Sequence, residues 1–276
     1  MEAKINAIPI RAIELRAIIS LLVRHWPILL LGLLAAIVLL WGLGQSSLRD
    51  WDEAIYAQVA KEMIQNGDWL TQYYGNKLRF EKPPLLPWIT AVLYHFLGVT
   101  EYWSRAPTAV SSILLVIITY LVGRQIYDGR TGFLAGVALL SSYEFIKRAR
   151  MGTTDSMLTL FVYLAIYAYL NLRNGAQRWW YLVWVSFALA FMLKSWAALI
   201  APAIIGLELL LDGHTTTALR SRSFWQGALL AFILAAPWHI IMCLTHGQAF
   251  LDTYLARNLF LRTTTALEGH VGGPLH

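Results

Sequence analysis

The sequence predicts an all-α protein that crosses a membrane several times, and three observations support this prediction. Of its 276 residues, 58% are hydrophobic and only 14% are charged, with a mean hydropathy of +0.54, whereas soluble chains carry about 25% charge. The charges are clustered, and the runs between them approach the roughly 20 apolar residues that a spanning helix needs. Several of the twelve Trp residues lie near the ends of these runs, as headgroup anchors do. A soluble enzyme, a disordered chain and a coiled coil are therefore excluded.

Seven apolar runs are predicted to be membrane spans. Residues 1–25 carry four cations, and no small-residue cleavage site follows the first run, so we expect a cytoplasmic segment before an uncleaved anchor. Residues 26–276 are expected to form one transmembrane domain, in which two polar stretches, 45–106 and 244–276, are external. The predicted spans are 26–44, 107–123, 131–146, 156–171, 179–193, 196–211 and 224–243.

The first external stretch is predicted to contain an amphipathic helix over 52–66 that lies flat at the membrane interface. Asp50 or Asp52 can cap its start, and Gly67 supplies the stop. The apolar residues that recur on one face, at helical spacing, are Ile55, Val59 and Met63.

The segment 83–98 is ambiguous, because it is uncharged but short and contains several prolines. It is either a span or a second interfacial helix, and counting cations on the two sides does not decide between them. We favour the interfacial interpretation, because it places every cluster of reactive groups on the external side. It also places three tight loops, each with two Arg, in the cytoplasm: 124–130, 172–178 and 213–223.

Two adjacent carboxylates, Asp52 and Glu53, follow the first span. Carboxylates at a membrane surface can bind a divalent cation or accept a proton. The alternative is that they only begin a helix, because acidic residues favour the positive end of the helix dipole.

A second cluster, Glu81 and Lys82, stands at a chain reversal fixed by prolines. Lys82 can contact a phosphate, with Glu81 as a metal ligand or orienting group. Alternatively, Lys82 only extends along apolar surface toward water, and Pro84 begins a helix.

Three cations, Lys147, Arg148 and Arg150, precede Asp155 on a predicted external loop. External cations oppose the positive-inside tendency, and a lipid phosphate would compensate them. Asp155 opens the next span and is, on the alternative interpretation, only its N-cap. Lys194 interrupts an apolar stretch, where ionisable groups are costly and often functional, unless it merely occupies the turn between two spans.

The terminal stretch carries Glu268 and His270 in a Gly-rich segment, which can act as a lid or donate a metal ligand, or is a solvated loop. His239 lies inside an apolar span and is expected to be a hydrogen-bonded packing residue. The single cysteine, Cys243, excludes intrachain disulfides and zinc–thiolate clusters. The net charge of +6 is modest for a membrane protein and indicates no nucleic-acid partner.

Eight short motifs follow one another along residues 26–275. The first is the charge-free first span, and the other seven are Asp52-Glu53 with Tyr56-Ala57, Gly67-Asp-Trp69, Phe80-Glu-Lys-Pro-Pro84, Ala149-Arg-Met-Gly-Thr-Thr-Asp155, Leu193-Lys194, Ala236-Pro-Trp-His239 and Glu268-Gly-His-Val-Gly-Gly-Pro274. Each is weak alone, but in this order they resemble the dolichyl-phosphate-mannose protein mannosyltransferase superfamily. Within it, the chain is most similar to the bacterial 4-amino-4-deoxy-L-arabinose lipid A transferases, which have the GT-C fold.

The resemblance implies an inverting glycosyltransferase in the bacterial inner membrane, with its active site facing the periplasm. It implies a polyprenyl-phosphate sugar donor and a lipid or protein acceptor. The positions assigned to catalysis are Asp52, Asp155 and, beside the first, Glu53. Those assigned to the donor are Tyr56, Lys82 and Lys194, and one of Arg148 or Arg150 would help to grip its phosphate. Glu81 and His270 match positions that can hold a divalent metal ion.

The chain departs from the family in two respects. Family members continue for several more spans and a C-terminal external domain, so we expect a truncated polypeptide that lacks most acceptor determinants. Ser195 also replaces the glycine that usually follows the lysine at Lys194.

Two other function classes compete with an enzyme. A transporter or lipid flippase without covalent chemistry would place its polar groups near the bilayer midplane and show internal repeats, neither of which is evident. A structural membrane anchor does not explain the external cations.

Overall fold

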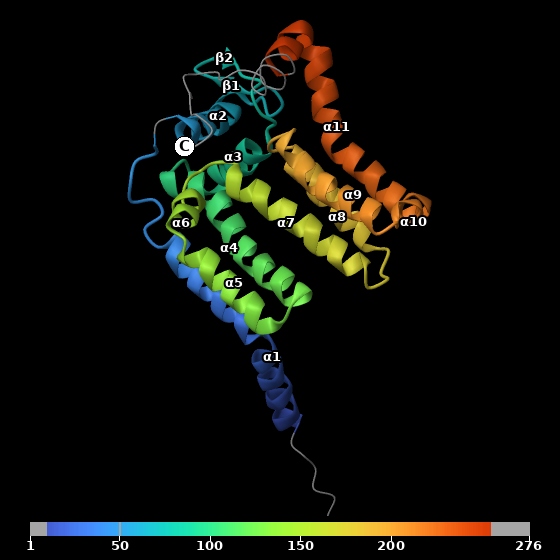
Figure 1. Cartoon of the computed structure of the whole chain (residues 1–276). Helices are drawn as coiled ribbons and strands as arrows, with labels where there is room; N and C mark the ends of the chain where they lie inside the picture. Colours follow the sequence, from blue (N-terminus) through green and yellow to red (C-terminus); the bar gives the residue numbers. More distant parts are fainter. Residues whose placement is uncertain (1–9, 50, 255–276) are drawn as a thin grey trace, which may run out of the picture.

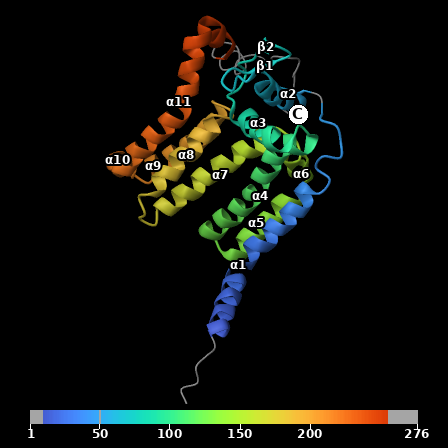
Figure 2. The same ribbon diagram turned by 180° about the vertical axis from the view of Figure 1, so that it is seen from behind.

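The computed structural model describes residues 10–49 and 51–254, and apart from one short hairpin its regular structure is helical (Figure 1). The long helices lie side by side in a bundle, as Figures 1 and 2 show from opposite sides. They are α1 (Ile10–Leu40), α4 (Glu101–Ile126), α5 (Gly129–Ser141), α7 (Asp155–Leu172), α8 (Trp179–Phe191), α9 (Ile200–Leu211) and α11 (Arg222–Phe250).

Three helices in the described part of the chain are long and apolar enough to cross a membrane: Glu101–Ile126, Asp155–Leu172 and Arg222–Tyr254. Four shorter apolar helices, His25–Leu40, Leu85–Leu97, Trp179–Phe191 and Ala197–Leu211, accompany them. Every predicted span coincides with helical structure, so the bundle itself is confirmed, while the count of seven spans stays a prediction.

The predicted span 131–146 is wrong as a single helix, because the chain breaks at Ser142. Helix α5 ends at Ser141, and the short helix α6 (Tyr143–Ala149) starts in a new direction. The hydroxyl of Ser142 accepts a hydrogen bond from the backbone N–H of Phe145 at 3.5 Å, which caps α6. Serine competes with the helix for backbone groups and so favours such a boundary.

The last described helix is longer than predicted. We expected a span over 224–243 followed by a polar loop, but α11 continues to Phe250 across a kink at Gly247, where φ is 50° and ψ is −123°. Residues 255–276 lie outside the described residues, and so do the predicted sites at Glu268 and His270.

The stretch 45–106, which was predicted to be external, folds at one end of the bundle (Figure 1). It contains α2 (Asp52–Asn66), a two-residue hairpin of β1 (Tyr73–Tyr74) and β2 (Lys77–Leu78), and α3 (Leu85–Leu97). Helix α3 has 13 residues, about 20 Å at 1.5 Å per residue, which is shorter than the roughly 30 Å of a bilayer core. Helices α5 and α8 are equally short, so length does not separate α3 from the predicted spans, and the interfacial interpretation of 83–98 stays a prediction.

Helix α2 has the predicted bounds, with Val59 and Met63 fully buried and Gly67 in the left-handed conformation that ends it. Its predicted cap is wrong for Asp52, because the N-cap residue is Trp51 and makes no side-chain capping bond. Glu53 instead fixes the chain that enters the helix, because it accepts a hydrogen bond from the backbone N–H of Arg49 at 2.8 Å. Asp50 lies outside the described residues.

Candidate active site

The candidate site forms where four segments meet at the same end of the bundle. Asp52 begins α2, Lys82 precedes α3, Asp155 begins α7 and Lys194 follows α8. Two long helices, α4 and α5, carry the chain away from this end and back, which explains why residues a hundred positions apart share one face. A buried apolar cluster fastens the four segments together: Tyr56, Leu86, Met157 and Leu193.

Asp52 and Lys82 form the first ion pair of the site. Lys82 Nζ lies 3.6 Å from Asp52 Oδ2, and the two side chains are 12% and 50% exposed. Tyr56 lies one helical turn after Asp52, and Lys82 Nζ sits 5.1 Å from the centre of its ring, within cation–π range. Burial and the nearby charge of Asp52 raise the pKa of the Tyr56 hydroxyl, so it stays protonated.

Asp155 and Lys194 form the second ion pair, in which Lys194 Nζ donates to Asp155 Oδ1. Arg148 Nη1 approaches the other carboxylate oxygen at 3.8 Å. Lys82 also acts electrostatically on Asp155, so the two ion pairs lie within range of each other. Three cations, Lys82, Lys194 and Arg148, gather here around Asp52 and Asp155, and cations of this kind can bind an anionic ligand.

Glu53 has a structural role in the fold, and the catalytic role expected for it stays a prediction. Its side chain is 1% exposed and pairs with Arg105 at 2.7 Å. It also accepts the backbone N–H of Gly152 at 2.9 Å, which ties α2 to the loop before α7. Burial alone would raise the pKa of Glu53, but Arg105 and the N–H groups of Arg49 and Gly152 more than offset this and hold it below its ordinary value.

Arg150 is likewise engaged in structure. Its Nη1 donates to the carbonyl of Val38 at 2.8 Å and to that of Leu39 at 3.4 Å, at the C-terminal end of α1. These carbonyls lack helical partners, and a cation there also favours the helix dipole. Of the two alternatives for a phosphate-gripping arginine, the geometry therefore favours Arg148, although Glu144 also accepts from its Nε at 2.9 Å.

The two predicted metal ligands do not come together within the described residues. Glu81 is 42% exposed and accepts from Arg79 Nη2 at 2.7 Å, and His270 lies outside the described range. No group of three or more His, Cys, Asp or Glu suited to a metal ion occurs in the part of the chain that the structure describes. The residues seen here thus give no metal centre on which a reaction step can be built.

Comparison with known proteins agrees with this geometry. A family described as dolichyl-phosphate-mannose-protein mannosyltransferase matches residues 81–241, more than half of the chain. The chain belongs to this family. A relative in Pseudomonas savastanoi pv. phaseolicola, an undecaprenyl phosphate-alpha-4-amino-4-deoxy-L-arabinose arabinosyl transferase, is 30% identical over 75% of this chain and 40% of its own length.

Two solved structures share the fold. ArnT from Cupriavidus metallidurans, bound to undecaprenyl phosphate, superposes with a TM-score of 0.70 at 23% identity and covers 86% of this chain and 45% of its own. The Archaeoglobus fulgidus oligosaccharyltransferase gives a TM-score of 0.57 at 14% identity over 81% of this chain and 31% of its own. These likenesses confirm a GT-C fold. The chain spans less than half the length of each of these relatives.

An apolar cleft of about 650 Å³ opens beside the site, between α8 and α11. Its walls are Trp, Phe, Leu and Ala side chains, and its polar atoms come from Ser195, His239 and Tyr254. His239 Nε2 hydrogen-bonds the Tyr254 hydroxyl at 2.8 Å, and Ser195 hydrogen-bonds the same hydroxyl. His239 is therefore the hydrogen-bonded packing residue that the sequence predicts.

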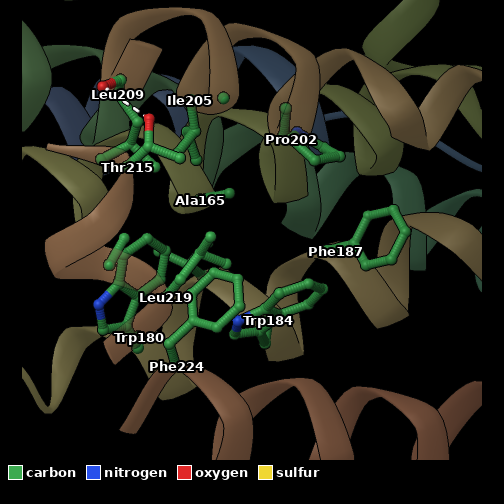
Figure 3. Close-up of a pocket in the computed structure, with 14 residues that line it drawn as sticks. Ala165, Trp180, Trp184, Phe187, Pro202, Ile205, Leu209, Thr215, Leu219 and Phe224 are labelled. Carbon is green, nitrogen blue, oxygen red and sulfur yellow. Dashed lines mark hydrogen bonds between the residues drawn. The ribbon is translucent and has the colours of Figure 1, made fainter. Parts of the chain in front are cut away.

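A second apolar pocket, of about 170 Å³, lies at the far end of α8 from Lys194 (Figure 3). Trp180, Phe224 and Leu219 line one side of it, and Pro202 and Ile205 line the other. No charged or titratable side chain is among its lining residues, so it is not part of the candidate site.

Sequence reasoning missed two arginines. Arg105 is 3% exposed, pairs with Glu53 and also donates to the carbonyls of Leu43, Ser46 and Ser47. Arg79 lies two residues before Glu81, and its guanidinium is 5.7 Å from the centre of the Tyr56 ring. The signal that identifies Arg79 is a cation that lies close to Tyr56, an aromatic residue of the predicted site.

Proposed function

We propose that this chain carries the catalytic part of an inverting membrane glycosyltransferase. It moves a sugar from a polyprenyl-phosphate donor to a lipid or protein acceptor, at the periplasmic face of a bacterial inner membrane. The observation that carries the proposal is the convergence of Asp52, Lys82, Asp155 and Lys194 at one end of an apolar helical bundle. The family, and the undecaprenyl-phosphate substrates in the names of its relatives, support the same reaction class.

The donor phosphate is the leaving group, and its negative charge needs stabilisation. Lys82 and Lys194, helped by Arg148, hold the phosphate through charge-assisted hydrogen bonds. Asp155 keeps the Lys194 ammonium in place through their direct hydrogen bond. The apolar cleft beside Lys194 has the position and lining to accept the adjoining part of the prenyl chain.

Asp52 is the group placed to activate an acceptor. The acceptor oxygen attacks the anomeric carbon from the face opposite the phosphate, so the new C–O bond forms as the bond to the phosphate oxygen breaks. If the acceptor is a hydroxyl, its proton passes to the Asp52 carboxylate, which is half exposed and within reach of solvent. If the acceptor is a phosphate, no proton moves and Asp52 orients the reacting groups.

The family resemblance implies a divalent metal ion held by Glu81 and His270, and this metal site stays a proposal. Glu81 is fit to serve only if it leaves Arg79, with which it now pairs. No step above is assigned to the metal.

The function is tested by incubating purified full-length chain with radiolabelled polyprenyl-phosphate sugar and a membrane lipid extract. We expect label in a new lipid or protein product only when the acceptor fraction is present. Movement of the labelled donor across a vesicle bilayer, without any new product, would instead support a transporter or flippase.

Membrane orientation is tested by cysteine labelling. Asp128 Oδ1 accepts the Thr131 N–H and caps α5, so its 74%-exposed neighbour Tyr127 is the better reporter of that loop. In a Cys243→Ser background, we expect a membrane-impermeant reagent to label Lys77→Cys in the external hairpin. It should miss Tyr127→Cys until the membrane is opened. Labelling of Tyr127→Cys in sealed cells would refute the orientation.

A further inference from the structure

Arg79 is a buried cation with one unused hydrogen-bond donor. Its backbone N–H donates to the Gln72 carbonyl at 2.9 Å, which fixes the loop after β2, and its side chain is only 6% exposed. Nη2 donates to Glu81, but Nη1 is buried and has no hydrogen-bond partner among the described residues. A buried charged donor without an acceptor is costly, so its retention calls for an explanation.

The unused donor lies beside the proposed phosphate-binding lysine. Arg79 Cζ and Lys82 Nζ lie 5.7 and 5.1 Å from the centre of the same Tyr56 ring. Arg79 and Lys194, from distant parts of the chain, also act electrostatically on the Tyr56 hydroxyl. Arg79 and Lys82 therefore lie at the same aromatic ring, and a phosphoryl group bound by Lys82 has a second cation near it. The planar guanidinium is suited to phosphoryl oxygens, which accept its N–H groups in a fixed geometry.

A trapped water molecule is the competing explanation. Gln72 Oε1 is also buried without a hydrogen-bond partner, and Gln72 Nε2 donates to the Lys82 carbonyl at 2.7 Å. One water between Arg79 Nη1 and Gln72 Oε1 would satisfy both atoms. Arg79 would then serve only to stabilise the loop.

We propose that Arg79 binds an anionic phosphoryl oxygen of a substrate through its unused Nη1 group, next to Lys82. This inference rests on the proposed function. It adds Arg79 to the cations already assigned to the substrate phosphate, which are Lys82, Lys194 and Arg148. The oxygen belongs either to the phosphate of the prenyl donor or to a phosphate on the acceptor, and the arms of the test distinguish these sources.

The test measures binding of polyprenyl phosphate, without sugar, to the full chain in lipid nanodiscs. We expect Arg79→Gln to weaken binding at least tenfold. Arg79→Lys should recover part of the affinity, because lysine keeps the positive charge but lacks the planar set of N–H donors. The matched control is Lys77→Gln, which removes an exposed cation from β2 two residues before Arg79 and should bind as the wild type does. If the acceptor supplies the oxygen, Arg79→Gln instead raises the KM for a phosphorylated acceptor at least tenfold and leaves polyprenyl-phosphate binding unchanged.

The proposal would be overturned in favour of the bridging water if Arg79→Gln lowered the melting temperature but still bound both substrates as the wild type does. Should Arg79→Gln fail to fold, unchanged affinities and KM values in Arg79→Lys would overturn it equally. If the wild-type chain itself binds no polyprenyl phosphate, the proposed function fails, and the role of Arg79 with it.

Discussion

Replacing Asp52 by asparagine should abolish sugar transfer while leaving the folded chain intact. The substitution keeps the shape of the side chain but removes the charge that accepts a proton from a hydroxyl acceptor. Loss of general-base catalysis typically slows a reaction by about 10²–10⁴-fold. We therefore expect product formation in the radiolabel assay to fall by at least two orders of magnitude.

Stability should change little, because Asp52 is half exposed and has one long ion pair with Lys82 at 3.6 Å. Exposed pairs of this kind contribute about 0–1 kcal/mol to the free energy of unfolding. The matched control is Glu101→Gln, which removes an exposed carboxylate from the first turn of α4. This control should transfer sugar at the wild-type rate.

Retained turnover in Asp52→Asn would remove Asp52 from the catalytic role. A loss of activity that is accompanied by a large drop in melting temperature would indicate a structural role instead. The assay should therefore be run on protein whose folded fraction has been measured by size exclusion and thermal unfolding.

The contrast between Asp52 and Glu53 shows what the sequence can and cannot predict. The pattern of α2, its length and its stop at Gly67 are local and were readable from apolar spacing and one glycine. The roles of the two carboxylates were not local. Neighbours on an α-helix point about 100° apart, so Asp52 pairs with Lys82 while Glu53 enters the interior and meets Arg105, 52 residues away.

The arginines before Asp155 illustrate the same limit. The sequence predicted external cations compensated by a lipid phosphate, and in the structure Arg148 contacts the carboxylates of Glu144 and Asp155, so the phosphate contact stays a prediction. Arg150 instead satisfies backbone carbonyls at the end of α1, more than 100 residues earlier. Only tertiary packing decides which cation faces a site and which completes a helix end.

The buried pair of Glu53 and Arg105 should dominate the stability of the stretch 45–106. Both side chains are at most 4% exposed, and Arg105 also donates to three backbone carbonyls between α1 and α2. Removing one partner of such a pair leaves an uncompensated buried charge, which costs about 3–5 kcal/mol. We therefore expect Glu53→Gln to lower the melting temperature sharply, because Arg105 then keeps its charge without a carboxylate.

The pH dependence of stability gives an independent measurement. The pKa of Glu53 is lower in the folded chain than its ordinary value, so the folded state binds this proton less readily than the unfolded state does. The stabilisation is therefore present above the unfolded pKa of about 4.3, and it is lost as the pH falls through the folded pKa. Glu53→Gln should lack this part of the acid dependence, so the two melting curves should converge as the pH is lowered.

The comparison needs a control variant that breaks an exposed ion pair and leaves the buried pair intact. Glu208→Gln removes a partner of Arg173, whose side chain is 54% exposed, and should cost no more than about 1 kcal/mol. In the double variant Glu53→Gln with Arg105→Met, the unpaired charge is gone, so part of the lost stability should return. Equal melting temperatures for Glu53→Gln and Glu208→Gln would show that the buried pair contributes no more than a surface pair, and that the segments around α2 are held chiefly by their apolar contacts.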